Sequence, residues 1–264
     1  MSLNLILTLS LIQGITEFLP ISSSGHLVII PFFMELPYQG KLFDISVHFG
    51  SLFAVIFYLR SDISKIVQDL FSKNRSLSFG YKITKNIILA SLPLIIFGYI
   101  VNSYDFKFLQ LIEIVGWTTL IFGIILGISD KVKIKTYNLP KTKESIIIGI
   151  FQSLALLPGV SRSGIVITMA RFLGHNRSSS SKFALFLSIP AILGATTLKL
   201  LSIISNENIH FSNEIFLGLI LSFIFAFLTI KIFMNYIEKA SLQIFVFYRI
   251  LLGIFILYLV YLNN

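Results

Sequence analysis

The sequence contains no cysteine, and only 12% of its 264 residues are charged. The absence of cysteine excludes disulfide bonds, thiolate chemistry and cysteine-ligated metal. The charged fraction is about half of the roughly 25% found in ordinary soluble domains. Basic residues are also missing from the beginning of the chain, because none precedes Lys41. A cleaved signal peptide begins with a basic segment, so we expect none here.

Hydrophobic residues make up 55% of the chain, and the mean hydropathy is +0.87. Apolar runs recur that approach the roughly 20 residues a helix needs to cross a bilayer. The composition predicts an all-α polytopic membrane protein with a single membrane domain, residues 1–264, and disfavours a soluble helical protein with a large core. We predict six full transmembrane helices, at residues 42–59, 86–101, 109–128, 183–204, 216–233 and 244–262.

Two further apolar segments are each interrupted by polar residues. Residues 3–36 are broken at 20–25, and residues 145–174 are broken at 158–164. An unpaired polar group costs roughly 2–7 kcal/mol in hydrocarbon, so these breaks cannot face lipid. We therefore predict two re-entrant helix-break-helix hairpins whose breaks line an enclosed or watered cavity.

The net charge of +9 would favour nucleic-acid binding in a soluble protein, but here the basic residues are placed as orientation signals. Sixteen of the 21 Lys and Arg residues lie in four regions, 60–85, 130–144, 171–182 and 231–239, the first with an expected amphipathic surface helix. If neither hairpin crosses the membrane, these regions share one side, which the positive-inside rule makes cytoplasmic. Both termini are then outside, the hairpins enter from opposite faces, and no nucleic acid partner is expected.

The two halves of the chain follow the same pattern, which predicts an inverted-topology repeat of residues 1–130 and 145–264. At an offset of 139 positions the polar residues of the breaks coincide, Gln13 with Gln152, Ser22 with Ser161, Ser24 with Ser163 and Gly25 with Gly164. Inverted repeats with discontinuous helices place their site at the repeat interface, near the bilayer midplane. The two breaks should therefore meet there.

The second break has the residues of an anion site. The planar fork of Arg162 suits phosphate oxygens, and the helix restarting after Pro158 adds unpaired N–H groups and a positive dipole end. Together the two breaks favour a multiply charged anion such as pyrophosphate; a structural ion pair is the alternative role for Arg162. The substrate-binding candidates are Gln13, Ser22, Ser24, Gly25, His48, Ser161, Ser163 and Gly164.

The first break supplies candidates for acid–base and nucleophilic chemistry. Glu17 and His26 are close enough to couple as a base and its orienting group. A serine of residues 22–24 would then be the nucleophile, or His26 would activate water. The alternative is a buried polar network that only fixes the hairpin. His48 lies on a predicted span and is either a site residue or a satisfied interior histidine.

Three other polar residues are placed by position alone. Arg249 lies inside the last predicted span, so we expect it to be structurally paired. His175 and His210 lie in predicted loops, and we expect both to be solvated.

Several motifs together resemble one enzyme family. Residues 14–26 (GITEFLPISSSGH) and 158–164 (PGVSRSG) resemble motifs of the bacitracin-resistance type of undecaprenyl pyrophosphate phosphatase, and the match extends to residues 43–50, 186–194 and 248–249. The resemblance implies an integral enzyme of the bacterial cytoplasmic membrane. Such an enzyme removes the terminal phosphate from undecaprenyl diphosphate, which regenerates the lipid carrier for cell-wall synthesis and confers bacitracin tolerance.

The resemblance also implies site residues and a cofactor. Glu17, Ser23, His26 and Arg162 match the family's catalytic candidates, and a divalent cation, magnesium or calcium, is the implied cofactor. The family's first motif is Glu/Gln-x-x-x-Glu, and this chain has Gln13 at its first position, which leaves Glu17 as the one candidate metal ligand there. The implied partners are a polyprenyl diphosphate and membrane lipid, with a homodimer left open.

Two rival functions remain to be weighed. A lipid phosphatase of the phosphatidic-acid type needs a His six residues after the Arg and an Asp four residues later, but Thr168 and Phe172 stand there. A transporter or flippase of the polyprenyl phosphate carrier fits the predicted architecture, because inverted repeats with opposed hairpins are typical of transporters.

Overall fold

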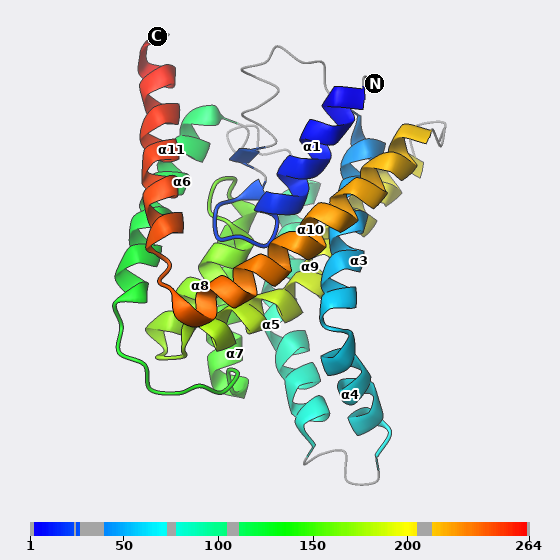
Figure 1. The fold of residues 1–264 in the computed structure, drawn as a ribbon, viewed down its shortest axis with the longest axis vertical. Coiled ribbons are helices and arrows are strands. Elements are labelled where there is room, and N and C mark those ends of the chain that lie inside the picture. The colour runs from blue at the N-terminus through cyan, green and yellow to red at the C-terminus, as the bar shows by residue number, and fades with distance from the viewer. Residues whose placement is uncertain are drawn as a thin grey trace.

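The computed structural model describes residues 3–23, 25–26, 40–72, 78–104, 111–204 and 213–262. These parts of the chain are helical, apart from connections and one isolated bridge between Thr136 and His175. The elements are α1 (Leu3–Thr16), α3 (Lys41–Tyr58), α4 (Arg60–Leu70), α5 (Phe79–Ser103), α6 (Ile112–Asp130), α7 (Thr142–Gln152), the 3-10 helix η3 (Ser153–Leu156), α8 (Arg162–Phe172), α9 (Arg177–Ile204), α10 (Asn213–Lys239) and α11 (Gln243–Leu262) (Figure 1).

Six of these helices are long and apolar enough to cross a membrane: α3, α5, α6, α9, α10 and α11. The predicted number of spans is thus confirmed. Helices α5 and α9 begin several residues before the predicted spans, at Phe79 and Arg177. Polar residues at a membrane interface do not end a helix, so hydropathy alone places these starts too late. The predicted surface helix is also present as α4, whose Ile66 is buried.

The two broken segments pack in a related way. Helix α1 contacts α10, and helix α7 contacts α5. In the second segment α7 and η3 are followed by a non-helical break and then by α8. In the first, α1 and its break are described except for Ser24, whereas only Gly25 and His26 of the predicted second arm, residues 25–36, are among the described residues. The start of α1 and the end of α11 lie at one end of the molecule, and the α6–α7 connection and the end of α4 lie toward the other (Figure 1).

A buried charge cluster joins the ends of four helices. Asp130, at the end of α6, accepts two hydrogen bonds from Arg177 (2.6 and 3.0 Å) and one from the backbone N–H of Leu242 (3.1 Å). Arg171, at the end of α8, donates to the carbonyls of Asp130 and His175. Of the two histidines expected in solvent, His175 is in fact 1% exposed because the connection before α7 covers it, and His210 lies outside the described residues.

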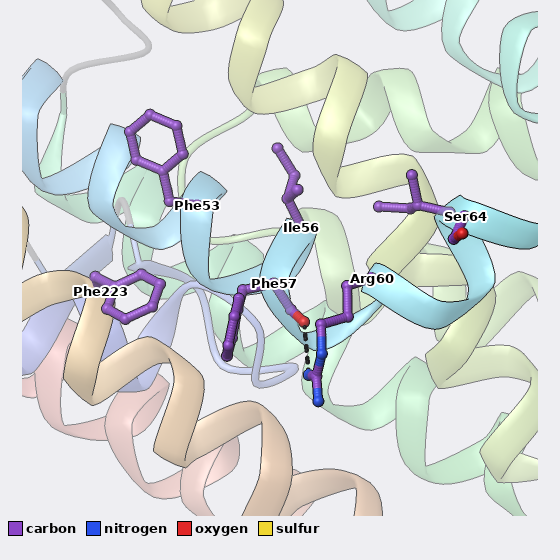
Figure 2. Close-up of a pocket in the computed structure, with 7 residues that line it drawn as sticks. Phe53, Ile56, Phe57, Arg60, Ser64 and Phe223 are labelled. Atoms are coloured by element: carbon purple, nitrogen blue, oxygen red, sulfur yellow. Dashed lines mark hydrogen bonds between the residues drawn. The ribbon is translucent and has the colours of Figure 1, made fainter. Parts of the chain in front are cut away.

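An apolar groove of about 460 Å³ lies on the outside of the bundle, where α3, α4 and α10 meet (Figure 2). Phe53, Phe57 and Phe223 line it, and Arg60 lies at the end toward α4, with its guanidinium donating to the Phe57 carbonyl (3.1 Å). None of its lining residues belongs to the two breaks. The groove is therefore part of the lipid-facing surface and not of the polar interior.

Close contact between α7 and α5 depends on Gly149, since a Cβ there would lie 2.6 Å from the Ala90 Cα. We expect Gly149→Ala to destabilise the protein by about 1–3 kcal/mol, because the two helices would have to separate. Gly194, within α9, has no heavy atom within 4 Å of such a Cβ. Gly194→Ala should instead stabilise by about 0.5–1 kcal/mol through helix propensity. Thermal unfolding in detergent measures both variants. An equal rise in the two unfolding midpoints would contradict the close packing of α7 on α5 at Gly149.

Candidate active site

The carboxylate of Glu17, directly after α1, is the centre of the buried polar site. Its Oε1 accepts a hydrogen bond from Nη2 of Arg162 (2.8 Å), the first residue of α8. Its Oε2 accepts from the Ser23 hydroxyl (2.8 Å) and from the side-chain amide of Gln13 (2.9 Å). Glu17 is only 9% exposed. The structure thus brings four of the predicted site residues together, and the two breaks meet as expected.

Each break turns at a serine in the left-handed conformation. Ser22 has φ 76° and Ser161 has φ 70°, and among the described residues no other non-glycine residue has positive φ. Each hydroxyl accepts the backbone N–H three residues later, that of Gly25 (3.3 Å) and that of Gly164 (3.2 Å). Such a conformation costs about 1–3 kcal/mol and persists only where its surroundings hold it. The positions are those that the sequence offset pairs.

Direct hydrogen bonds fix the two breaks to each other. The Ser163 hydroxyl donates to the Leu19 carbonyl (2.7 Å). Arg249, fully buried on α11, has no carboxylate within ion-pair distance among the described residues. Its guanidinium donates to four backbone carbonyls, those of Pro20 (3.3 Å), Thr119 (3.3 Å), Gly159 (2.9 Å) and Val160 (3.0 Å). The structural pairing expected of Arg249 is therefore with carbonyls of both breaks and α6.

His26 is held away from Glu17. Its Nδ1 lies 2.7 Å from the Ser22 carbonyl oxygen and its Nε2 lies 2.5 Å from the Tyr248 hydroxyl. The two rings stack, with centroids 5.7 Å apart and planes 7° from parallel. The prediction that Glu17 orients His26 is wrong, because the left-handed turn at Ser22 directs Ser23 toward the carboxylate instead. Sequence reasoning gave Tyr248 no role in the site. Its position beside an intramembrane arginine was the signal that could have pointed to one.

His48, on α3, joins the site through Gln13. Its Nδ1 lies 2.8 Å from Nε2 of Gln13 and 3.7 Å from Oε2 of Glu17. Because the Gln13 amide is a donor toward the carboxylate, its second N–H can donate to His48 Nδ1, which places the imidazole proton on Nε2. His48 is thus a member of the site and not an isolated interior histidine.

The predicted anion donors are not all free. Nη1 of Arg162 is buried and has no hydrogen-bond partner in the described parts of the chain. The hydroxyls of Ser161 and Ser163 lie 3.2 Å apart and also make the cap and the bond to the first break. Ser24 lies outside the described residues. The guanidinium therefore has an unused donor for an anion, whereas these two hydroxyls hold the backbone.

The described residues do not form a protein-held site for a divalent cation. Both oxygens of Glu17 already accept N–H or O–H donors, and Gln13 directs an N–H at the carboxylate where a second carboxylate would bind metal. The described residues contain no group of three or more His, Cys, Asp and Glu that could hold an ion. A cation held by Glu17 would have to share oxygens that already accept three hydrogen bonds.

Six apolar helices around a buried cluster of one carboxylate, one guanidinium and one serine define a polytopic membrane protein with a buried polar site. The chain belongs to the family described as bacitracin resistance protein BacA, whose model matches residues 6–255.

The relatives share almost the whole chain. A protein of Pelagibacter ubique named undecaprenyl-diphosphatase is 42% identical over 260 residues, which is 97% of each chain. Proteins with the same name from Campylobacter curvus and Alcanivorax borkumensis are each 39% identical, over 96% of this chain and 97% of theirs. The resemblance seen in the sequence motifs is thereby confirmed.

Removing the charge of Glu17 should leave a buried guanidinium without its counter-ion. We expect Glu17→Gln to lower the free energy of unfolding by about 3 kcal/mol, since loss of one partner exposes the desolvation cost of the other. The matched control is Glu113→Gln, because Glu113 accepts a hydrogen bond from Tyr261 at the surface. That change should cost less than about 0.5 kcal/mol. Equal midpoint shifts in detergent would show that the Glu17–Arg162 pair does not hold the breaks together.

Proposed function

We propose that this chain hydrolyses undecaprenyl diphosphate to undecaprenyl phosphate and inorganic phosphate. The observation that carries the proposal is the hydrogen bond from Ser23 to a carboxylate that Arg162 also holds, inside a membrane bundle. The names of the relatives give the same activity. The reaction returns the lipid carrier to cell-wall synthesis and confers resistance to bacitracin, which captures the diphosphate form.

Arg162 is the proposed diphosphate anchor. Its Nη2 is occupied by Glu17, whereas its buried Nη1 is unused. The start of α8 adds backbone N–H groups and the positive end of the helix dipole. Phosphoryl transfer requires mainly positioning and charge stabilisation, which a guanidinium and a helix N-terminus both provide. The isoprenoid tail would lie between the spans, in lipid.

Ser23 is the proposed nucleophile and Glu17 its base. The serine oxygen attacks the terminal phosphorus while its proton passes to Oε2 of Glu17, and the bond from phosphorus to the bridging oxygen breaks to release undecaprenyl phosphate. Water then cleaves the phosphoserine. His26 acts as the acid–base group for this water or for the leaving oxygen. Direct attack by water, with His26 as base, is the alternative route.

The site geometry also supports the finer architecture that the sequence predicts. We infer an inverted repeat with two re-entrant hairpins, because Ser22 and Ser161 share a rare conformation and the same cap. The matching contacts of α1 with α10 and α7 with α5 support the same inference. The basic regions would face the cytoplasm and both termini the outside of the bacterial inner membrane.

The divalent cation implied by the family resemblance, magnesium or calcium, fits the substrate better than the protein. Both oxygens of Glu17 already accept hydrogen bonds, and Gln13 offers an N–H on that side. We therefore propose that any cation required is carried on the diphosphate oxygens, and we assign no catalytic step to it.

Phosphate release from a short-chain prenyl diphosphate by the purified protein in detergent tests the function. We expect phosphate release in detergent, without sealed vesicles, because hydrolysis, unlike transport, does not need two compartments separated by a membrane. A chelator arm measures the cation requirement. Absence of phosphate release, together with transfer of polyprenyl phosphate across reconstituted vesicles, would favour the flippase function instead.

Arg162→Lys should reduce phosphate release about 100-fold or more, because an ammonium cannot contact Glu17 and a phosphate along two parallel directions. The matched control is Arg60→Lys, at the outer groove, which should leave the rate unchanged. Near-wild-type release by Arg162→Lys would remove the shared-guanidinium mechanism.

Ser23 should become transiently phosphorylated if it is the nucleophile. Rapid-quench labelling with a terminal-phosphate-labelled prenyl diphosphate should trap phosphoserine in the wild-type protein and none in Ser23→Ala. His26→Gln should slow loss of the label, since it removes the group that serves the water step. A wild-type burst without any labelled serine would support direct attack by water.

A further inference from the structure

Tyr248, far from the first break in the sequence, makes a side-chain hydrogen bond and a ring stack with His26. It is the sixth residue of α11, and its hydroxyl lies 2.5 Å from His26 Nε2 while the two rings stack. The contact joins residues that are 222 positions apart in the sequence. Tyr248 is 41% exposed, so burial of the ring does not by itself account for its position.

The hydrogen bonds around His26 fix the location of its protons. The Ser22 carbonyl can only accept, so His26 Nδ1, which lies 2.7 Å from it, must carry a proton. In the neutral imidazole Nε2 is then the acceptor, and the Tyr248 hydroxyl must be the donor. The result is a neutral histidine whose Nε2 lone pair accepts the Tyr248 hydrogen bond, so Nε2 takes up a proton only when that hydrogen bond opens.

The neighbouring residue explains how α11 holds this contact in place. Arg249 binds carbonyls from both breaks, including those of Pro20 and Gly159, and it is completely buried. Sliding or rotation of α11 would break these bonds, so the backbone of Tyr248 is fixed relative to the first break. The phenol is therefore placed by the same residue that holds the two breaks.

We propose that Tyr248 is a positioning residue for the phosphatase reaction, which holds the ring of His26 and its Nε2 in place by stacking and by a hydrogen bond, while the Ser22 carbonyl sets the Nδ1-protonated tautomer. This inference rests on the proposed function. Tyr248 acts through His26 and not on the substrate. Its loss should therefore lower turnover and leave substrate affinity unchanged.

Tyr248→Phe tests the proposal, because it keeps the stacked ring and removes only the hydroxyl. We expect kcat to fall about tenfold, a part of the roughly 100- to 10,000-fold that acid–base catalysis contributes, with KM within about twofold of wild type. The control is Tyr258→Phe, which changes an exposed tyrosine of the same helix and should alter neither constant. An unchanged kcat, or a raised KM with kcat unchanged, would overturn the proposal.

Nitrogen NMR of histidine-labelled protein in detergent provides a second readout that a merely structural role would not change. The chain has only four histidines, and the His26 signals are assigned from their loss in His26→Asn. Wild-type protein should show His26 protonated at Nδ1, with a hydrogen-bonded Nε2. Tyr248→Phe should keep this tautomer, because the Ser22 carbonyl remains, and should shift the Nε2 resonance. Protonation at Nε2 in the wild type, or an unchanged Nε2 resonance in Tyr248→Phe, would overturn the proposal. This measurement stands even if the wild-type protein releases no phosphate, which would contradict the proposed function alone.

Discussion

The ion pair between Glu17 and Arg162 is the interaction on which the rest of the site depends. The two charges come from different halves of the chain and lie 2.8 Å apart with side chains that are 8% and 13% exposed. Neither charge would be tolerated alone at this depth, so each break is stable only when the other is present. The same pair places Ser23 on one carboxylate oxygen and leaves one guanidinium nitrogen unused. The Glu17–Arg162 pair is therefore needed both to hold the two breaks together and for the proposed chemistry.

The backbone around the pair is held by polar groups that have no direct chemical role. Two left-handed serines lie in the two breaks, and each hydroxyl accepts the backbone N–H three residues later, Ser161 as the N-cap of α8. In hydrocarbon the carbonyls left free by such turns would be costly. Arg249 satisfies three of them at once and also binds the carbonyl of Thr119. Arg249 has no carboxylate partner among the described residues. It is stable there because its hydrogen bonds satisfy carbonyls that the two breaks leave free.

The sequence was sufficient for the parts of the structure that follow from composition and local chemistry. The six spans, the surface helix α4 and the meeting of Glu17 with Arg162 were predicted. The partner of His26 was not, because the direction of that side chain depends on the left-handed turn at Ser22. The sequence pattern does not reveal the positive φ of Ser22. It also does not reveal that the hydroxyl of Tyr248, 222 positions away in the sequence, lies 2.5 Å from Nε2 of His26. Contacts set by tertiary packing were missed for the same reason, as with His175.

Gln13 shows how one substituted group changes the charge balance of the site. A carboxylate at this position would lie beside Glu17 and His48, and repulsion between two carboxylates would have to be relieved by a proton or a cation. The amide avoids this, because it donates to the Glu17 carboxylate and to Nδ1 of His48. One carboxylate and one guanidinium then give a site without net charge before substrate arrives. The attraction for a diphosphate must therefore come from the unused Nη1 of Arg162 and from the N-terminus of α8. In the proposed mechanism, the guanidinium that holds Glu17 would also align the bound phosphate with the carboxylate that receives the serine proton.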